Sequence, residues 1–324
     1  MTVLSVRNVY KSFSSTSLLG SNADKKRAVI DSSFALASGE TLAIVGESGS
    51  GKSTLARLAM RLLRSDAGEV FWQGEEVSQL STRVLRSRRH HIQMVFQDPF
   101  ASLNPRMKIW ESVGEGLRVH HRALSHAQRR ERVAETLFLC GLDDSGMDRY
   151  PHQFSGGQRQ RIGIARALIV EPKVLVLDEP VSALDVSVQA QILNLLNQLQ
   201  KERGLSYLFI SHDLSVVRHI ADRVAVMFAG RIIETASAEA LFRGCRHPYT
   251  QALLDARPII HPNERLNAQP ASTVDEGVAL SGCPFQLRCA HVEPDCAHYQ
   301  CLLNQDNVAC LHPLATRRPQ GYDE

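Results

Sequence analysis

The feature that most constrains the fold is a glycine-rich loop between a short apolar run and an amphipathic segment. The apolar run covers residues 41–45, and the loop that follows it, residues 46–54, reads GESGSGKST. The amphipathic segment beyond it predicts a helix, with core-facing spacing at Leu55, Leu58, Ala59 and Leu62. Strand, loop and helix in this order fit the phosphate-binding pattern G-x-x-x-x-G-K-[ST].

Each residue type in this loop has a chemical reason. Glycines let the backbone curl so that successive amide groups point at an anion, and the start of the helix adds a favourable dipole. Lys52 supplies positive charge to the β- and γ-phosphates, and the Ser53 hydroxyl is placed to ligate Mg²⁺. We therefore expect ATP to contact the whole loop, which comprises Gly46, Glu47, Ser48, Gly49, Ser50, Gly51, Lys52, Ser53 and Thr54.

Two acidic residues follow a second apolar run. Residues 174–177 read Val-Leu-Val-Leu, and Asp178 and Glu179 come directly after them. Open α/β sheets place their sites at the carboxyl ends of parallel strands, so these acids are expected beside the phosphate loop. We expect Asp178 to hold Mg²⁺ and Glu179 to polarise the water that attacks the γ-phosphate.

The order of segments predicts the fold class. Strand-like and helix-like segments alternate up to about residue 255, which is typical of an α/β domain with parallel strands. A third apolar run, residues 207–210, is expected to form another buried strand. Between about residues 98 and 170 the strand signal fades, and patterns rich in Arg, Glu and Leu indicate an inserted helical subdomain.

A second glycine pair opens another helical segment, in Phe154-Ser155-Gly156-Gly157-Gln158 followed by RQRIGIARAL. A Ser-Gly-Gly start of a helix is a second anion cradle, for the same physical reason as the first. With this motif the chain resembles the nucleotide-binding subunits of ABC transporters, with Phe154 where leucine is commonest. The resemblance implies that this segment, through Ser155 and Gly157, caps the γ-phosphate of ATP held on a partner subunit.

Other motifs of that family follow in the expected order. The resemblance implies that Gln97, in VFQDP, senses Mg²⁺ and couples to the membrane domain, and that His212, in ISHD, contacts the γ-phosphate. Asp185, in SALD, matches a loop that crosses the dimer interface, and Phe13, in KSF, matches an aromatic that stacks on adenine. An ordinary core position is the alternative for Phe13. The implied fold is a P-loop NTPase of ABC type, with a parallel-sheet core, an antiparallel β part and the inserted helices.

Longer segments narrow the resemblance to importers of dipeptides and oligopeptides. They include SLNPR, RHPYTQALL and DEPVSALDVSVQAQILNLL, and the likeness is greatest to the F-type ATPase subunits of dipeptide permeases. It implies an ATPase at the cytoplasmic face of the bacterial inner membrane, paired with a second homologous ATPase subunit under two permease subunits. A periplasmic or extracellular peptide-binding protein would supply the substrate. A nickel or glutathione importer of the same branch, and a regulatory subunit that does not hydrolyse ATP, remain alternatives.

Composition excludes several other classes. Of the 324 residues, 44% are apolar, which is enough for a substantial core, and the formal net charge of +3 does not predict a nucleic-acid partner. No run approaches the ~18 consecutive apolar residues of a membrane span. An ABC ATPase acting on DNA would carry a long coiled-coil insertion, and a translation-type ABC protein would carry two sets of nucleotide motifs. The sequence has neither.

Five of the seven cysteines fall between residues 283 and 310, and in an intracellular chain this clustering predicts a metal before disulfides. The spacing lacks the C-x-x-C knuckles of common zinc modules, and four thiolates suit either zinc or an iron–sulfur cluster. The family resemblance implies a [4Fe–4S] cluster on Cys283, Cys289, Cys296 and Cys310, with Cys301 as an extra cysteine. Zinc and unliganded cysteines remain alternatives, because the segment that leads into the tail departs from the family's pattern.

These features divide the chain in two. We expect a nucleotide-binding domain at residues 1–256, followed at 257–324 by a linker and a small cysteine-rich C-terminal domain. Prolines and weak periodicity place the linker at 257–282. A tail with little apolar content needs a metal to offset its ordering entropy, so its role is expected to be structural. Cys140 and Cys245 are expected to be ordinary buried or loop cysteines.

Overall fold

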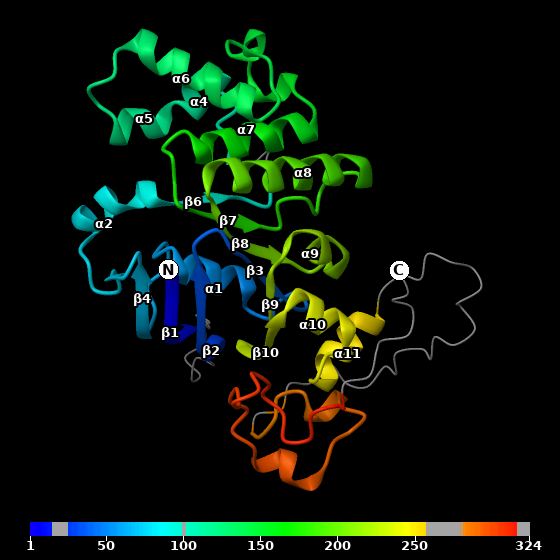
Figure 1. Ribbon diagram of the computed structural model, residues 1–324. Coiled ribbons are helices and arrows are strands. Elements are labelled where there is room, and N and C mark those ends of the chain that lie inside the picture. Colours follow the sequence, from blue (N-terminus) through cyan, green and yellow to red (C-terminus); the bar gives the residue numbers. More distant parts are fainter. Residues whose placement is uncertain (15–24, 99–101, 257–278, 280, 316–324) are drawn as a thin grey trace, which may run out of the picture.

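The computed structural model describes most of the chain: residues 1–14, 25–98, 102–256, 279 and 281–315 (Figure 1). Most of the predicted linker, residues 257–282, lies outside the described residues. So do residues 99–101, which follow closely after Gln97, the residue expected to couple to the membrane domain. In the part that is described, no helix is both long enough and apolar enough to cross a membrane.

The described strands form two sheets. They are β1 (Thr2–Ser14), β2 (Lys25–Ala37), β3 (Thr41–Val45), β4 (Ala67–Trp72), β5 (Glu75–Glu76), β6 (Ile92–Val95), β7 (Val174–Asp178), β8 (Ser206–Ser211), β9 (Arg223–Phe228) and β10 (Arg231–Ser237). The larger sheet has the order β10-β9-β3-β8-β7-β6; its strands are parallel from β9 to β6, and β10 is antiparallel to β9. The smaller sheet, β2-β1-β4-β5, is antiparallel. The predicted parallel core and antiparallel part are both confirmed.

The three apolar runs predicted as buried strands are the central strands β3, β7 and β8. All three are buried along their whole length. Their side chains point alternately to the two faces, so that on β3 Ala43 and Val45 join one hydrophobic cluster and Leu42 and Ile44 join the other. Strands with two apolar faces need a covering layer on each side.

Helices cover one face of the parallel sheet, and α1 with the antiparallel sheet covers the other (Figure 1). The described helices are α1 (Lys52–Ala59), α2 (Thr82–Arg88), α4 (Ile109–Val113), α5 (Glu115–His120), α6 (His126–Leu139), α7 (Gly156–Leu168), α8 (Val186–Arg203), α9 (Leu214–Ile220), α10 (Ala238–Arg243) and α11 (Pro248–Asp255). Helices α4 to α7 lie between β6 and β7 in the chain, as expected for an inserted helical subdomain.

The helix after the phosphate loop is shorter than its apolar pattern suggests. Leu55, Leu58 and Ala59 are fully buried, as predicted, but Leu62 is 48% exposed, so its predicted place in the core is wrong. Helix α1 ends at Ala59, and Arg61 takes a left-handed backbone conformation with φ of 52°. This reversal breaks the helical period before Leu62 and turns its side chain outward.

The described part of the cysteine-rich tail, residues 281–315, packs directly on the nucleotide-binding part. Phe285, Cys301 and Ala309 belong to the same hydrophobic cluster as the central strands. The backbone of the tail also bonds to β10: Ala309 N–H donates to the Ile233 carbonyl at 2.7 Å, and the Thr235 N–H donates to the Asn307 carbonyl at 2.9 Å. In Figure 1 the tail lies below β10, α10 and α11.

Candidate active site

The phosphate loop joins β3 to α1 and has the curled backbone that its glycines permit. Gly46, Gly49 and Gly51 have φ of 151°, 79° and 107°, values that side-chain-bearing residues rarely adopt. A Cβ on Gly46 would lie 2.1 Å from the Met227 carbonyl oxygen, and one on Gly51 would lie 2.3 Å from the Ala28 carbonyl oxygen. The neighbouring backbone thus leaves room for glycine alone, while the space beside Gly49 is open.

Lys52 lies across the loop instead of extending into solvent. Its ammonium group donates to the carbonyl oxygens of Gly46 at 2.8 Å and Glu47 at 2.9 Å, and the residue is 5% exposed. Burial lowers the pKa of Lys52, while the carboxylates of Glu179, Asp178 and Glu47 oppose that shift. Its charge is therefore stabilised by acidic neighbours at the place where phosphate is expected to bind.

Ser53 and Asp178 lie together, although 125 positions separate them in the chain. The Ser53 hydroxyl donates to Asp178 Oδ1 at 2.9 Å. Burial raises the pKa of Asp178, and the hydrogen bond from Ser53 opposes that shift. A hydroxyl and a carboxylate are hard oxygen donors of the kind that Mg²⁺ prefers, so this pair fits the expected metal.

Gln97 and His212 both bond to one carboxylate oxygen of Glu179. The Gln97 amide donates to Glu179 Oε2 at 3.0 Å, and His212 Nδ1 lies 3.1 Å from the same oxygen. Glu179 is the first residue after β7 and has a left-handed φ of 47°, while its amide bonds to the Ile210 carbonyl at the end of β8. Three residues from separate strand ends therefore meet at one carboxylate, beside the Ser53–Asp178 pair.

The second glycine segment opens α7 at the surface. Ser155 is the N-cap of this helix: its hydroxyl accepts from the Gln158 amide at 3.3 Å, and the Gln158 side chain accepts from the Ser155 amide at 3.0 Å. Gly157 lies against α8, since a Cβ there would meet Val188 Cγ1 at 2.5 Å. Gly156 has no such restriction, because its nearest neighbour would be Leu184 Cδ2 at 3.5 Å.

Two further predicted contact residues are solvent-exposed. Phe13 lies near the end of β1, is 43% exposed, and has the Lys11 ammonium 5.8 Å from its ring centroid. Asp185 precedes α8 and makes no capping hydrogen bond with its side chain. Both are accessible to a ligand or a partner, and Phe13 is not an ordinary core residue.

Sequence reasoning missed two residues that form hydrogen bonds with Glu47, the second residue of the phosphate loop. The Arg288 guanidinium donates to both carboxylate oxygens of Glu47, at 2.7 and 2.9 Å, and the Tyr249 hydroxyl accepts from the Glu47 amide at 2.9 Å. Arg288 belongs to the cysteine-rich tail, 241 positions after Glu47. No local pattern could have revealed a contact over that separation.

The predicted cysteine ligands are close enough to interact electrostatically. Burial, together with the nearby thiols of Cys283, Cys289 and Cys296, raises the pKa of Cys310 to about 11, against the opposing effect of a backbone hydrogen bond from His312. A hydrogen bond from Cys301 lowers the pKa of Cys283 to about 4, and the same bond raises the pKa of Cys301. The four predicted thiols therefore face a common region, and their soft sulfur atoms are chemically suited to iron or zinc.

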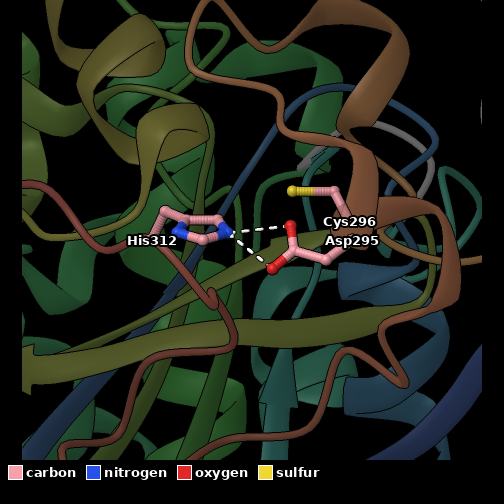
Figure 2. Close-up of side chains that lie close together, drawn as sticks. All are labelled: Asp295, Cys296 and His312. Atoms are coloured by element: carbon pink, nitrogen blue, oxygen red, sulfur yellow. Dashed lines mark hydrogen bonds and ion pairs between the residues drawn. The ribbon is translucent and has the colours of Figure 1, made fainter.

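A histidine–aspartate pair joins two parts of the tail beside one of these cysteines. His312 Nε2 lies 2.9 and 3.0 Å from the two carboxylate oxygens of Asp295 (Figure 2). The thiol of Cys296 lies close enough that the three side chains could together hold a metal ion. Asp295 raises the pKa of His312, which favours a charged ion pair. This contact fixes the segment after Cys310 against the segment that carries Cys296.

Comparison with known proteins agrees with these motifs. Residues 29–182 match the family model described as ABC transporter, and residues 233–296 match one described as oligopeptide/dipeptide transporter, C-terminal region. An oligopeptide transport ATP-binding protein, OppF, from Haemophilus influenzae is 48% identical over 298 residues, covering 89% of each chain. The chain belongs to the ATP-binding subunits of oligopeptide and dipeptide ABC transporters.

Other members of this family are similarly close. OppF of Escherichia coli is 47% identical and covers 88% of this chain and 87% of its own, and the dipeptide transport ATP-binding protein DppF of the same organism is 47% identical with 89% and 87% covered. Among solved structures, the ATP-binding cassette MJ0796, described as a dimer in a post-hydrolysis state bound to ADP and Pi, has a TM-score of 0.66 and 30% identity. That match covers 72% of this chain and 98% of the other.

Proposed function

We propose that this chain hydrolyses ATP to power the import of dipeptides or short oligopeptides through a membrane ABC transporter. The observation that carries the proposal is the carboxylate of Glu179, which Gln97 and His212 both contact beside the Ser53–Asp178 pair. A base, a metal-binding pair and two polar side chains at the ends of parallel strands are the groups that phosphoryl transfer to water requires. The names of the relatives, which refer to oligopeptide and dipeptide transport, support the substrate class.

We assign a role in ATP hydrolysis to each of these side chains. Lys52 would exchange the carbonyl oxygens of its own loop for the β- and γ-phosphates, and Ser53 and Asp178 would hold Mg²⁺, which neutralises developing charge on the phosphates. Glu179 would accept a proton from the attacking water. Gln97 and His212 would leave Glu179 Oε2 and turn toward the metal and the γ-phosphate, which frees the carboxylate for that role.

The exposed start of α7 supports a site that two subunits share. Ser155, Gly156 and Gly157 lie at the surface or partly exposed, where they can cover the γ-phosphate bound to another subunit's loop. Asp185, exposed before α8, would lie at the same interface. We propose that the partner is a second, homologous ATPase subunit, and that Phe13 stacks on adenine.

The remaining partners follow from the transporter family. Two permease subunits would dock near residues 97–105, and a periplasmic or extracellular peptide-binding protein would act through them. The chain would then work at the cytoplasmic face of the bacterial inner membrane. A nickel or glutathione importer of the same branch is the second candidate, and identifying the ligand of the cognate binding protein would decide between them.

We also propose that the tail, within a C-terminal part at residues 257–324, binds a [4Fe–4S] cluster through Cys283, Cys289, Cys296 and Cys310. The proximity of Cys283, Cys289 and Cys296 to Cys310, whose pKa they raise, supports a shared site, and thiolate sulfur is the ligand that iron–sulfur clusters use. Anaerobic purification with iron and labile-sulfide assays tests this, and a folded, colourless, iron-free protein would contradict it.

Substitution of Glu179 by glutamine tests the hydrolytic role. Glu179→Gln keeps the size of the side chain and one accepting oxygen but removes the base, so ATP turnover by the assembled transporter should fall about 10²–10⁴-fold while ATP binding persists. Glu171→Gln is the matched control, because Glu171 also has a left-handed φ, of 54°, and contacts Arg132 at the surface. Undiminished turnover by Glu179→Gln would favour the alternative of a regulatory, non-hydrolysing subunit.

A further inference from the structure

The first polar residue of the phosphate loop is held by the cysteine-rich tail. Glu47 follows Gly46, and both of its carboxylate oxygens accept from the Arg288 guanidinium. The Glu47 amide is bonded separately to the buried hydroxyl of Tyr249. Paired, charge-assisted hydrogen bonds of this kind fix orientation as well as distance. The side chain and amide of Glu47 are thus bound to α11 and the tail.

Arg288 is itself held in place by an aromatic cluster. Phe285, three positions earlier, is 3% exposed and packs edge-on against Phe228 and Tyr249, with ring centroids 5.5 and 5.4 Å away. The Arg288 guanidinium carbon lies 5.7 Å from the ring centroid of Phe228 and 5.6 Å from that of Phe285. The rings therefore limit the positions that the guanidinium can take.

The same cluster meets the loop from a second direction. Phe228 ends β9, and the carbonyl of the preceding residue, Met227, closes the space beside Gly46. Tail, strand end and loop therefore form one packed unit around residues 46 and 47. A shift of the tail against Phe228 should therefore displace the loop backbone, because the Met227 carbonyl leaves no free space beside Gly46.

We propose that Arg288 is a positioning residue for nucleotide binding: through Glu47, the cysteine-rich tail holds the phosphate loop in the conformation that receives ATP. The inference rests on the proposed ATPase function and adds a dependence of nucleotide affinity on the tail. Arg288 is not expected to contact the nucleotide. Its loss should weaken nucleotide binding and leave the rate at which bound ATP is hydrolysed largely unchanged, since the base Glu179 and its partners Gln97 and His212 follow the ends of β7, β6 and β8.

The test measures ADP binding to the full-length chain by isothermal titration calorimetry. Arg288→Met keeps the apolar stem against the rings but removes the guanidinium, and should raise the ADP Kd roughly three- to sixfold, a modest effect because both partners are partly exposed. Glu47→Ala should raise the ADP Kd by a similar factor. The variant with both substitutions should bind ADP no more weakly than either single variant, because both remove the same contact. Arg288→Lys should recover part of the affinity.

Arg246→Met is the matched control. Arg246 forms an ion pair with Asp306 of the tail at 3.1 Å but has no contact in the loop among its described interactions. Wild-type affinity in this variant supports a specific role for Arg288, whereas an equal loss would overturn it in favour of general docking of the tail. Additive losses in the Arg288 and Glu47 variants, or wild-type affinity in Arg288→Met, would also overturn it.

Because binding linkage is reciprocal, ADP should also stabilise the tail. Hydrogen exchange of the backbone around Phe285 to Cys289 should slow when ADP binds to the wild-type chain, and Arg288→Met should reduce that protection. A wild-type chain that binds no nucleotide would overturn the proposed ATPase function together with this inference. A wild-type chain that binds ADP without protecting this segment would overturn the inference alone.

Discussion

Helices α6 and α7 begin with the same hydrogen-bonded arrangement, yet only α7 carries a predicted ligand-binding motif. In α6, Ser125 accepts from the Gln128 amide at 3.2 Å and Gln128 accepts from the Ser125 amide at 2.8 Å. Ser155 and Gln158 repeat this capping box in α7. Helix capping therefore explains the hydrogen bonds that Ser155 and Gln158 make within this chain.

What differs is the pair of residues inside each box. Helix α6 begins with His126 and Ala127, whereas α7 begins with Gly156 and Gly157, so no side chain covers the first amides of α7. Helix α1 goes further, because Gly51 at its N-cap provides no side-chain hydrogen bond at all. Every helix start leaves amides without partners inside the helix. The three helix starts thus form a series: α6 is capped and carries side chains over its first turn, α7 is capped but has only glycines there, and α1 has no side-chain cap and is the most open to an anion.

The largest effect of a substitution on ATP binding and turnover is expected at the start of α1, the most open of the three helix starts. Lys52→Ala removes the cation that complements the phosphate at α1, so ATP affinity and turnover should both fall about 10²-fold or more. Binding and turnover assays on the full-length chain measure this, with Lys201→Ala, on the exposed end of α8, as the control. Retained ATP binding would place the main phosphate contact elsewhere and break the proposed series.

The two capping boxes can be compared directly. Ser155→Ala and Ser125→Ala should each cost about 1 kcal/mol of unfolding free energy, because each removes one cap, which lowers Tm by roughly 2–4 °C. Only Ser155→Ala should also reduce turnover in the assembled transporter, by about 30-fold, with binding to the chain's own loop intact. Equal turnover in the two variants would mean that Ser155 serves only as a cap.

The smallest effect on turnover is expected at Gly157, where two substitutions distinguish a role in helix packing from a role in catalysis. Gly157→Ala places a methyl group against Val188 and should destabilise the fold by about 1–3 kcal/mol. Adding Val188→Ala makes room and should restore most of the thermal stability. Turnover should stay about tenfold low in the double variant, because the methyl group still covers the helix amides. Full recovery of turnover would assign Gly157 to helix packing alone.

Local patterns predicted the core of the site because its residues lie within or next to regular strands. The phosphate loop and the acids after β7 are short motifs whose flanking apolar runs fix their position. Leu62 escaped the same reasoning, since periodicity cannot show where a left-handed residue such as Arg61 ends a helix. The Arg288–Glu47 contact could not be predicted in this way, because it joins distant segments. Its geometry depends on the packing of Phe285 against Phe228 and Tyr249.

The way the tail meets β10 has a consequence for solubility. In the described part of the chain β10 is one of the two outer strands of the large sheet, and outer strands with open backbone groups recruit other chains. The backbone around Val308 bonds along this edge, and Ala309 covers apolar surface beside it. By occupying backbone groups of β10, the cysteine-rich tail should therefore also reduce edge-to-edge aggregation of the sheet. A chain cut after residue 256 is expected to self-associate even where its nucleotide site is complete.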